Sequence, residues 1–370
     1  MTDRFLVFLG IATFGLCACL VVSAPAFAEP YLAVQKGMKC GLCHTSPTGG
    51  GKRTPYGNIF AQQELPAKFL SRAGVAPNFW TGEVSKYLAV GGDLRGGWNQ
   101  TSVPGQPTSS NADLEELLAY VEVRLIPRYL SLYLDWKLRP DDPVSREEYL
   151  RLTLWSGRVY VKGGQFFLPY GFRIQDDSAF MRQIPGINYN TPDKGWEIGL
   201  EHGNWSGQLA ITRGTAGGPE IDSGKQYSMR LSYIRPTWRA GGSFNFNDSS
   251  IGNRQMQNIF AGLKTGRISW LVEFDYIIDD ETSTGRRSFW TSFIEANFAA
   301  WRGHNFKLSY EYFDPDVDVS ENQQNRISAV WEYFPIQFLQ TRVGYRRYDG
   351  IPQNPAQNRD QLFIELHVPF

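Results

Sequence analysis

Residues 128–138 read RYLSLYLDWKL, and four leucines and one tryptophan occupy every second position of this stretch. Tyr, Ser, Tyr, Asp and Lys stand between them. Successive side chains of a β-strand point to opposite faces, so the pattern predicts a strand with one apolar and one polar face. The same alternation recurs at 227–233, 268–276 and 305–312.

The length of these strands and the spacing of their connections indicate a membrane barrel. A soluble sandwich also alternates, but its strands are typically about five or six residues long. Here the runs reach about 9–12 residues, the length that a tilted strand needs to cross a bilayer. Short turns and long polar loops alternate along the chain, as in outer-membrane barrels. The short turns are expected near 126–127, 156–157, 203–204, 235–236, 265–266, 300–302 and 334–335, and the long loops near 99–112, 139–146, 168–193, 214–224, 248–254, 279–286, 314–322 and 349–359.

We therefore predict an all-β fold, an outer-membrane antiparallel β-barrel of about 16 strands over residues 84–370. The last strand, LFIELHVPF at 362–370, alternates up to a terminal Phe370. A terminal aromatic residue on an alternating strand resembles the assembly signal of bacterial outer-membrane proteins. The aromatic content of 14% also suits the girdles that such barrels carry at the membrane interfaces.

The expected lumen is charged, because the apolar faces of the strands are assigned to lipid. A barrel of this size is wide enough for an aqueous channel. The longest loop, Leu168–Asp193, joins the fifth and sixth strands, and in general porins that loop narrows the pore. Its segments 168–171 and 176–177 are candidates for a constriction, with an ordinary surface loop as the alternative. The side chains expected to face the lumen include both positive and negative charges, for example Arg230, Arg326, Arg342, Glu273, Asp275 and Glu311.

The N-terminus is expected to be an export signal. Residues 1–28 contain Arg4, an apolar run and an Ala26-Phe27-Ala28 cleavage site. The first two of the four cysteines, Cys17 and Cys19, lie within this signal, so cleavage leaves Cys40 and Cys43 in the mature chain.

Cys40-Gly41-Leu42-Cys43-His44 is the C-x-x-C-H sequence that attaches c-type haem. The two thiols bond to the haem vinyl groups, and the histidine becomes the proximal iron ligand. The alternatives are a disulfide and half of a metal site, but a zinc site needs ligands that no further cysteine supplies. We predict a monohaem cytochrome c-like segment over 29–80, with a short helix at 62–70 and one covalent haem c. So short a segment cannot build a hydrophobic core alone, so the haem would supply most of the apolar surface of that core.

The sixth iron ligand is less well defined by the sequence. Met181, in the longest loop, and His367, near the periplasmic rim of the last strand, are the two candidates. An open or water-bound position is the third alternative, and ligand identity sets the potential.

The motif GMKCGLCH at 37–44, followed by PYGNIF at 55–60 and then by the barrel, resembles the fused outer-membrane monohaem cytochrome–porin family. This family includes the iron-oxidising outer-membrane cytochromes. The resemblance implies that Cys40, Cys43 and His44 carry the haem. It also implies that Fe(II) or another extracellular donor reduces this haem, and that a periplasmic cytochrome or other carrier receives the electrons. The glycine run of residues 48–51 and Lys52-Arg53 depart from the iron-oxidising members.

Two functions are consistent with the sequence. The first is electron transfer across the outer membrane, an oxidoreductase activity of the Fe(II)-oxidising type. The second is a diffusion porin for small polar solutes, with a haem-bearing plug or sensor segment. The formal net charge is zero, so the composition lacks the excess of positive charge that is typical of nucleic-acid-binding proteins. No acid–base pair or nucleophile stands out as catalytic. Outer-membrane lipid is an expected partner, and porins of this size are often homotrimers.

Overall fold

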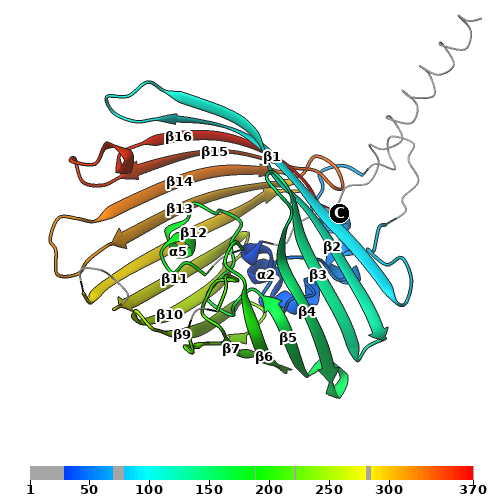
Figure 1. Ribbon diagram of the computed structural model, residues 1–370. Helices are drawn as coiled ribbons and strands as arrows, with labels where there is room; N and C mark the ends of the chain where they lie inside the picture. The colour runs from blue at the N-terminus through cyan, green and yellow to red at the C-terminus, as the bar shows by residue number, and fades with distance from the viewer. Residues whose placement is uncertain (1–28, 70–78, 188, 221, 281–284, 370) are drawn as a thin grey trace, which may run out of the picture.

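The computed structural model describes residues 29–69, 79–187, 189–220, 222–280 and 285–369. The predicted signal at 1–28 and Phe370 lie outside the described residues. Sixteen antiparallel strands form a closed barrel in which each strand pairs with its neighbours in sequence and β1 pairs with β16 (Figure 1). This confirms the predicted fold and strand number. The strands are β1 Leu88–Ser102, β2 Ser109–Ile126, β3 Leu130–Arg139, β4 Val144–Leu154, β5 Val159–Phe166, β6 Asp193–His202, β7 Trp205–Thr212, β8 Gln226–Ile234, β9 Trp238–Ser249, β10 Gly252–Thr265, β11 Ile268–Asp279, β12 Arg287–Trp301, β13 His304–Asp314, β14 Gln324–Tyr333, β15 Gln340–Asp349 and β16 Asp360–Pro369.

The connections follow the predicted alternation, and both ends of the barrel lie on the side of the short turns, the periplasmic side of such barrels. Three loops on the opposite side are shorter than predicted: residues 140–143 stand where the prediction had 139–146, residues 250–251 where it had 248–254, and residues 103–108 where it had a long polar loop at 99–112. Strands β1 and β2 instead stay paired as far as Thr101 and Ser109, so only residues 103–108 form the connection. The polar residues at these positions remain in strands because their backbone N–H and C=O groups are hydrogen-bonded across the hairpin.

The outer surface carries the apolar half of the alternation. Exposed side chains on it include Leu209, Leu231, Ile259, Val272 and Ile294. Aromatic side chains gather towards the short-turn ends of the strands, where the Trp205 and Tyr233 rings lie 4.8 Å apart. A second group stands at the opposite ends, where the Trp290 and Tyr312 rings stack at 4.6 Å. An apolar belt between aromatic girdles is the signature of a membrane-spanning barrel. In the ranges that the structure describes, no helix is long and apolar enough to cross a membrane.

Ile259 tests the assignment of the lipid face, because it lies in the middle of β10 and its side chain is 65% exposed. We expect Ile259→Arg to destabilise the folded barrel by about 2–4 kcal/mol, the cost of a lipid-facing arginine near the bilayer midplane. Reversible unfolding in urea from lipid vesicles measures this loss. Gln257→Arg, on the same face but one pair of residues nearer the loop end, is the control and should cost less. Equal costs at both positions would contradict the placement of the belt.

The inner surface is polar and densely ion-paired. The guanidinium of Arg342 lies 3.2 Å from Glu365, and Lys162 lies 3.1 Å from Glu197. These side chains are buried. In an unfilled barrel of this size they would line an aqueous channel. Their burial shows that other parts of the chain fill the lumen.

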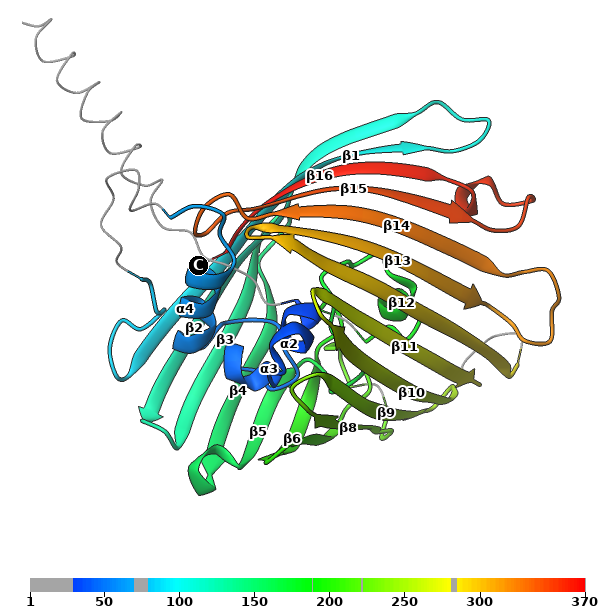
Figure 2. The same cartoon turned by 180° about the vertical axis from the view of Figure 1, so that it is seen from behind.

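The N-terminal segment fills the periplasmic half of the lumen. It forms α2 (Pro30–Lys36), α3 (Cys40–Cys43) and α4 (Pro55–Glu64), and Figure 2 shows α2 and α3 inside the ring of strands. A helix near 62–70 is what the sequence alone suggested; the helix instead begins after Thr54. The Thr54 hydroxyl caps it by accepting from the Gly57 N–H, and Pro55 occupies the first turn.

The loop between β5 and β6 folds into the lumen from the other side, which decides between the two alternatives for residues 168–193 in favour of the inward-folded loop. Tyr170 donates from Oη to Asp275 at 2.9 Å, and Asp176 pairs with Arg326 at 2.9 Å and with Arg346 at 3.0 Å. A short helix, α5 (Phe180–Gln183), lies within it. The loop and the N-terminal segment meet in one apolar cluster that also includes the barrel wall. Its members are Tyr31, Leu32, Val34, Ala61, Leu65, Phe172, Ile174, Ala179, Met181, Phe260, Leu271, Phe293 and Phe334.

Candidate functional site: a Cys-x-x-Cys-His turn in the barrel lumen

The Cys-x-x-Cys motif forms a single helical turn, α3, with His44 directly after it. Residues three apart on a helix lie on the same face, so Cys40 and Cys43 point to the same side. Both are free thiols, and both line one cavity together with His44. The structure therefore brings together the three residues that the sequence analysis singled out for haem attachment.

A glycine loop returns the chain beneath this turn. The Thr45 N–H donates to the Lys52 carbonyl at 2.9 Å, and Gly49, Gly50 and Gly51 between them all have positive φ. A side chain is strained in that conformation, and a Cβ on Gly50 would lie 2.6 Å from the Tyr189 ring. The glycine run that departs from the iron-oxidising cytochromes thus lets the loop turn tightly against the inward-folded β5–β6 loop.

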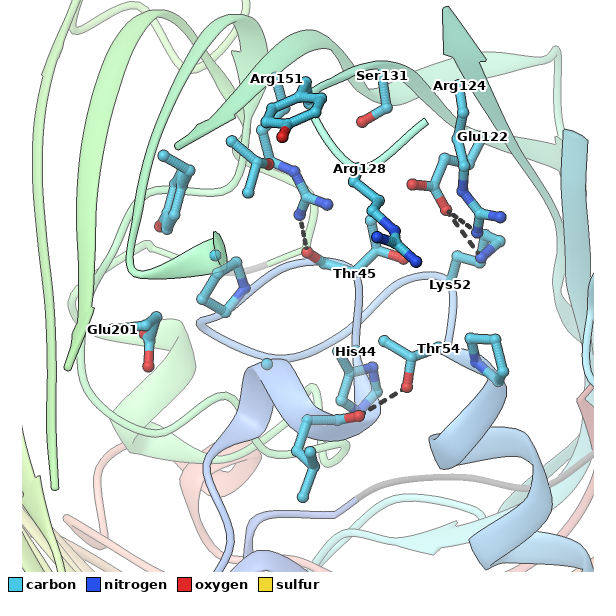
Figure 3. Close-up of a pocket in the computed structure, with 18 of the residues that line it drawn as sticks. His44, Thr45, Lys52, Thr54, Glu122, Arg124, Arg128, Ser131, Arg151 and Glu201 are labelled. Carbon is cyan, nitrogen blue, oxygen red and sulfur yellow. Dashed lines mark hydrogen bonds and ion pairs between the residues drawn. The ribbon is translucent and has the colours of Figure 1, made fainter. Parts of the chain in front are cut away.

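The site is fixed to the barrel wall on several sides. Lys52 pairs with Glu122 at 3.1 Å, and the backbone N–H of Lys52 donates to the Tyr133 hydroxyl at 2.8 Å. Arg151 donates to the Thr45 carbonyl, and Lys39 pairs with Glu201 at 3.0 Å. Figure 3 shows Glu122 and Arg151 of the wall beside Lys52 and Thr45 of the turn. The anchors come from strands β2, β3, β4 and β6, so the motif has a defined place in the lumen.

Gly57 lets α4 pack directly on α3. A Cβ on Gly57 would lie 2.2 Å from the Cys43 carbonyl oxygen, a distance that no packing tolerates. We expect Gly57→Ala to push α4 away from the motif, at a cost of about 1–3 kcal/mol in the stability of the segment. Limited proteolysis of residues 29–69 in the assembled protein would show this as faster cleavage. Gly41→Ala is the matched control, because its Cβ would first meet Pro47 at 3.4 Å. Equal protection of the two variants would contradict the close contact.

His44 is buried and lines three cavities at once. Burial and the neighbouring Arg53 charge lower the pKa of His44 to about 3, while backbone hydrogen bonds at Gly51 and Gly50 act in the opposite direction. Its imidazole is therefore neutral at physiological pH, the form that binds metals. Burial also raises the pKa of the Cys43 thiol to about 11.

The three cavities differ in character. A vestibule of about 940 Å³ lies among the short turns and includes Leu42, Thr54 and Arg128 in its wall (Figure 3). A mainly apolar cavity with about 40 Å³ of free space lies beside Cys40 and Cys43, walled by Leu32, Phe60 and Phe172 among others. A polar cavity of about 50 Å³ lies on the far side of His44 and includes Arg53, Arg95 and Tyr189.

These residues fit a covalently attached haem. The two thiols share one face, apolar side chains surround them, and the buried Nδ1 of His44 has no hydrogen-bond partner among the described residues. A metal-bound histidine typically holds its other ring nitrogen on a backbone carbonyl, and Gly50 and Gly51 supply that backbone here. The free space beside the thiols is smaller than a tetrapyrrole. The adjoining vestibule shares Met38, Lys39 and His44 with that cavity.

Neither predicted sixth ligand lies in the wall of the thiol cavity. Met181 is buried in the apolar cluster with Tyr31 and Leu32. His367 is buried near the rim, where its Nε2 pairs with Asp93. Met38 does line the cavity, and its sulfur accepts a long hydrogen bond of 3.6 Å from the Tyr56 hydroxyl. Met38 lies only two positions before Cys40 in the chain, too close to it for the Met38 sulfur to reach across a porphyrin attached there. No group of three or more His, Cys, Asp or Glu residues suited to a metal ion occurs among the described residues.

The comparisons with known proteins concern the barrel. No family model and no curated protein matches the sequence. OmpT of Vibrio cholerae, in its trimer form, is similar in structure with a TM-score of 0.61 at 11% identity, covering 76% of this chain and 99% of OmpT. An anion-selective porin from Comamonas acidovorans gives 0.58 at 9% identity over 76% and 99% of the two chains. OprB of Pseudomonas putida gives 0.59 at 8% identity over 77% and 94%.

These likenesses establish the fold, a porin-like 16-strand barrel. With the apolar belt and aromatic girdles, the architecture confirms the predicted location in the outer membrane of a Gram-negative cell.

Proposed function

We propose that this chain is a plugged outer-membrane barrel that carries one c-type haem on Cys40, Cys43 and His44 and moves electrons between the cell exterior and the periplasm. The observation that supports it most is the position of these three residues, which share one cavity inside the lumen. Bound there, the haem would supply the one-electron chemistry. The chain contributes the attachment, the position and an environment from which much of the water is excluded.

Because the lumen is filled, electron transfer is a better supported function than diffusion of solutes. The apolar cluster joins the N-terminal segment, the β5–β6 loop and the walls of β10, β11 and β12. Such a core bars hydrated solutes, whereas an electron needs only a redox centre that is close to donor and acceptor. The vestibule beside His44 opens among the periplasmic turns, where a soluble cytochrome is the proposed acceptor. Fe(II) or another extracellular reductant is the proposed donor.

Purified full-length protein in liposomes tests this proposal. The protein should show the absorption of covalent haem c, and Fe(II) added outside should reduce the haem and then a cytochrome enclosed in the vesicles. Reduction is expected only in vesicles that contain the protein. Protein without covalent haem, or with a haem that neither side can reduce, would refute the proposal.

A diffusion porin is the second candidate, and the likeness to porins supports it. In that case the N-terminal segment is a plug or sensor, and small polar solutes cross when it moves. Solute-swelling assays on the same liposomes separate the two functions. Swelling without haem reduction favours the porin, and reduction without swelling favours the conduit. The Vibrio OmpT structure is described as a trimer, and we propose the same assembly for this barrel.

A further inference from the structure

Two arginines face the cavity that holds the cysteines of the motif. Arg230 projects from β8 and is 4% exposed, and Arg173 comes from the inward-folded β5–β6 loop. Both line the cavity together with Cys40, Cys43 and His44. They reach it from different parts of the fold, 57 positions apart in the chain (230 − 173 = 57).

Neither arginine has a carboxylate partner within 4.0 Å among the described residues. Arg230 donates from Nε to the Gly171 carbonyl at 3.0 Å, and its guanidinium lies 4.7 Å from the centre of the Phe260 ring. Arg173 donates to the Thr48 hydroxyl at 2.8 Å, to the Gly49 carbonyl at 2.7 Å and to the Leu168 carbonyl at 2.9 Å.

Several other lumenal arginines do have such a partner. Arg326 pairs with Asp176 and Glu311, Arg342 with Glu365, and Arg146 with Asp135. A buried guanidinium without a counter-charge is costly, because neutral acceptors replace only part of its lost hydration. The fold thus places against the cavity of the thiols two guanidinium groups whose hydrogen bonds all go to neutral acceptors. Among the described residues Arg239 of β9 also lacks a carboxylate within 4.0 Å and donates to the Ala33 and Met38 carbonyls, but it does not line this cavity.

We propose that Arg173 and Arg230 form a carboxylate-binding site for the two propionate groups of the haem held by Cys40 and Cys43. This inference rests on the proposed haem attachment. A guanidinium presents a planar fork of donors that matches a carboxylate, and the bonds are strengthened by charge. One arginine for each propionate gives a neutral arrangement inside the lumen. A free anion such as inorganic phosphate has similar chemistry and is the competing occupant.

The site has a consequence for the redox equilibrium. Positive charge near the iron disfavours the ferric state, so loss of either arginine should lower the midpoint potential. We expect each Arg→Gln change to shift the reduction equilibrium constant about tenfold towards the ferric form, which corresponds to about 59 mV for a one-electron couple. A propionate that loses its partner should also protonate more readily, so the potential should become more dependent on pH.

Spectroelectrochemical titration of the full-length protein in detergent, repeated over a range of pH, is the test. It compares the wild type with Arg173→Gln, Arg230→Gln and the double variant. Arg342→Gln is the control, since it removes a buried lumenal arginine whose partner is Glu365. The two cavity variants should lower the potential, and the double variant should lower it further. Arg173→Lys and Arg230→Lys should restore part of the shift, and they replace the Gln variants if those do not assemble.

Two outcomes would overturn the assignment. In the first, the double variant keeps its haem but behaves like Arg342→Gln in both potential and pH dependence. In the second, inorganic phosphate stabilises the haem-loaded protein against heat and the double variant abolishes this effect, because the site then takes a free anion. Phosphate that stabilises only the haem-free Cys40→Ala/Cys43→Ala protein supports the assignment, since the propionates would otherwise occupy the site. A wild-type protein without covalent haem would refute the proposed function itself, and this result is read directly from the absorption spectrum.

Discussion

Replacement of His44 by alanine is expected to abolish reduction of the haem by an external donor in proteoliposomes. On the proposed function, Cys40 and Cys43 would still hold the haem, but His44 would no longer be there to bind its iron and help set its potential. We expect the rate of electron transfer to the enclosed cytochrome to fall by more than about 100-fold, beyond the range seen for loss of an outer-shell partner. Stopped-flow absorption of the haem bands measures this rate.

The barrel should assemble normally in the His44→Ala protein, because its strands pair without help from the motif. Heat-modifiable migration on gels reports that assembly. His202→Ala is the control, since His202 lies on the outer face at the end of β6. An unchanged rate in His44→Ala would show that His44 is not the axial ligand. Failed assembly would give the segment a structural role instead.

The second large effect is expected from a charge placed in the apolar cluster of the lumen. Val34 lies in α2, is 2% exposed and contacts the wall so closely that a Cβ on Gly262 would lie 2.5 Å from it. An unpaired carboxylate buried here costs about 3–5 kcal/mol. We expect Val34→Asp to release the N-terminal segment and to convert a closed barrel into a conducting one. Current across planar bilayers measures the change.

Lys36→Asp is the matched control, because it puts the same residue on the exposed side of the same helix. It removes the ion pair with Glu64 and the contact with the Phe60 ring. The side chains of Lys36 and Glu64 are 39% and 49% exposed, so their pair contributes little. The control protein should remain closed. If Val34→Asp assembled but stayed closed, the segment would not be the barrier. If the wild type conducted freely, the diffusion porin would become the better function.

The barrel follows from local patterns that need no tertiary information. A period of two along residues 128–138 fixes which side chains share a face, and the short turns on the periplasmic side lie where they were predicted. The Cys40–His44 motif is equally local, because haem attachment requires only those residues at that spacing. The start of α4 had a signal in Thr54-Pro55, an N-cap residue followed by proline, but the prediction placed a helix further on.

Other features depended on contacts between distant parts of the chain. Residues 103–108 form a short connection only because β1 and β2 stay paired beyond the predicted strand ends. The cavity partners of Cys40 are Phe172, Arg173 and Arg230, which lie more than a hundred positions away. No period or motif links such residues, since their proximity arises from closing the barrel and folding one loop inward.

The sequence by itself therefore determined the membrane barrel and the Cys40–His44 motif on which we propose that haem is held. Only the tertiary structure decided that this motif lies inside the lumen, within a closed apolar core and facing two arginines without acidic partners. The physical reason is the separation along the chain of the residues that set each feature. Strand alternation and thiol spacing are set by the geometry of neighbouring residues, whereas burial and charge compensation depend on what the rest of the chain brings to the same place.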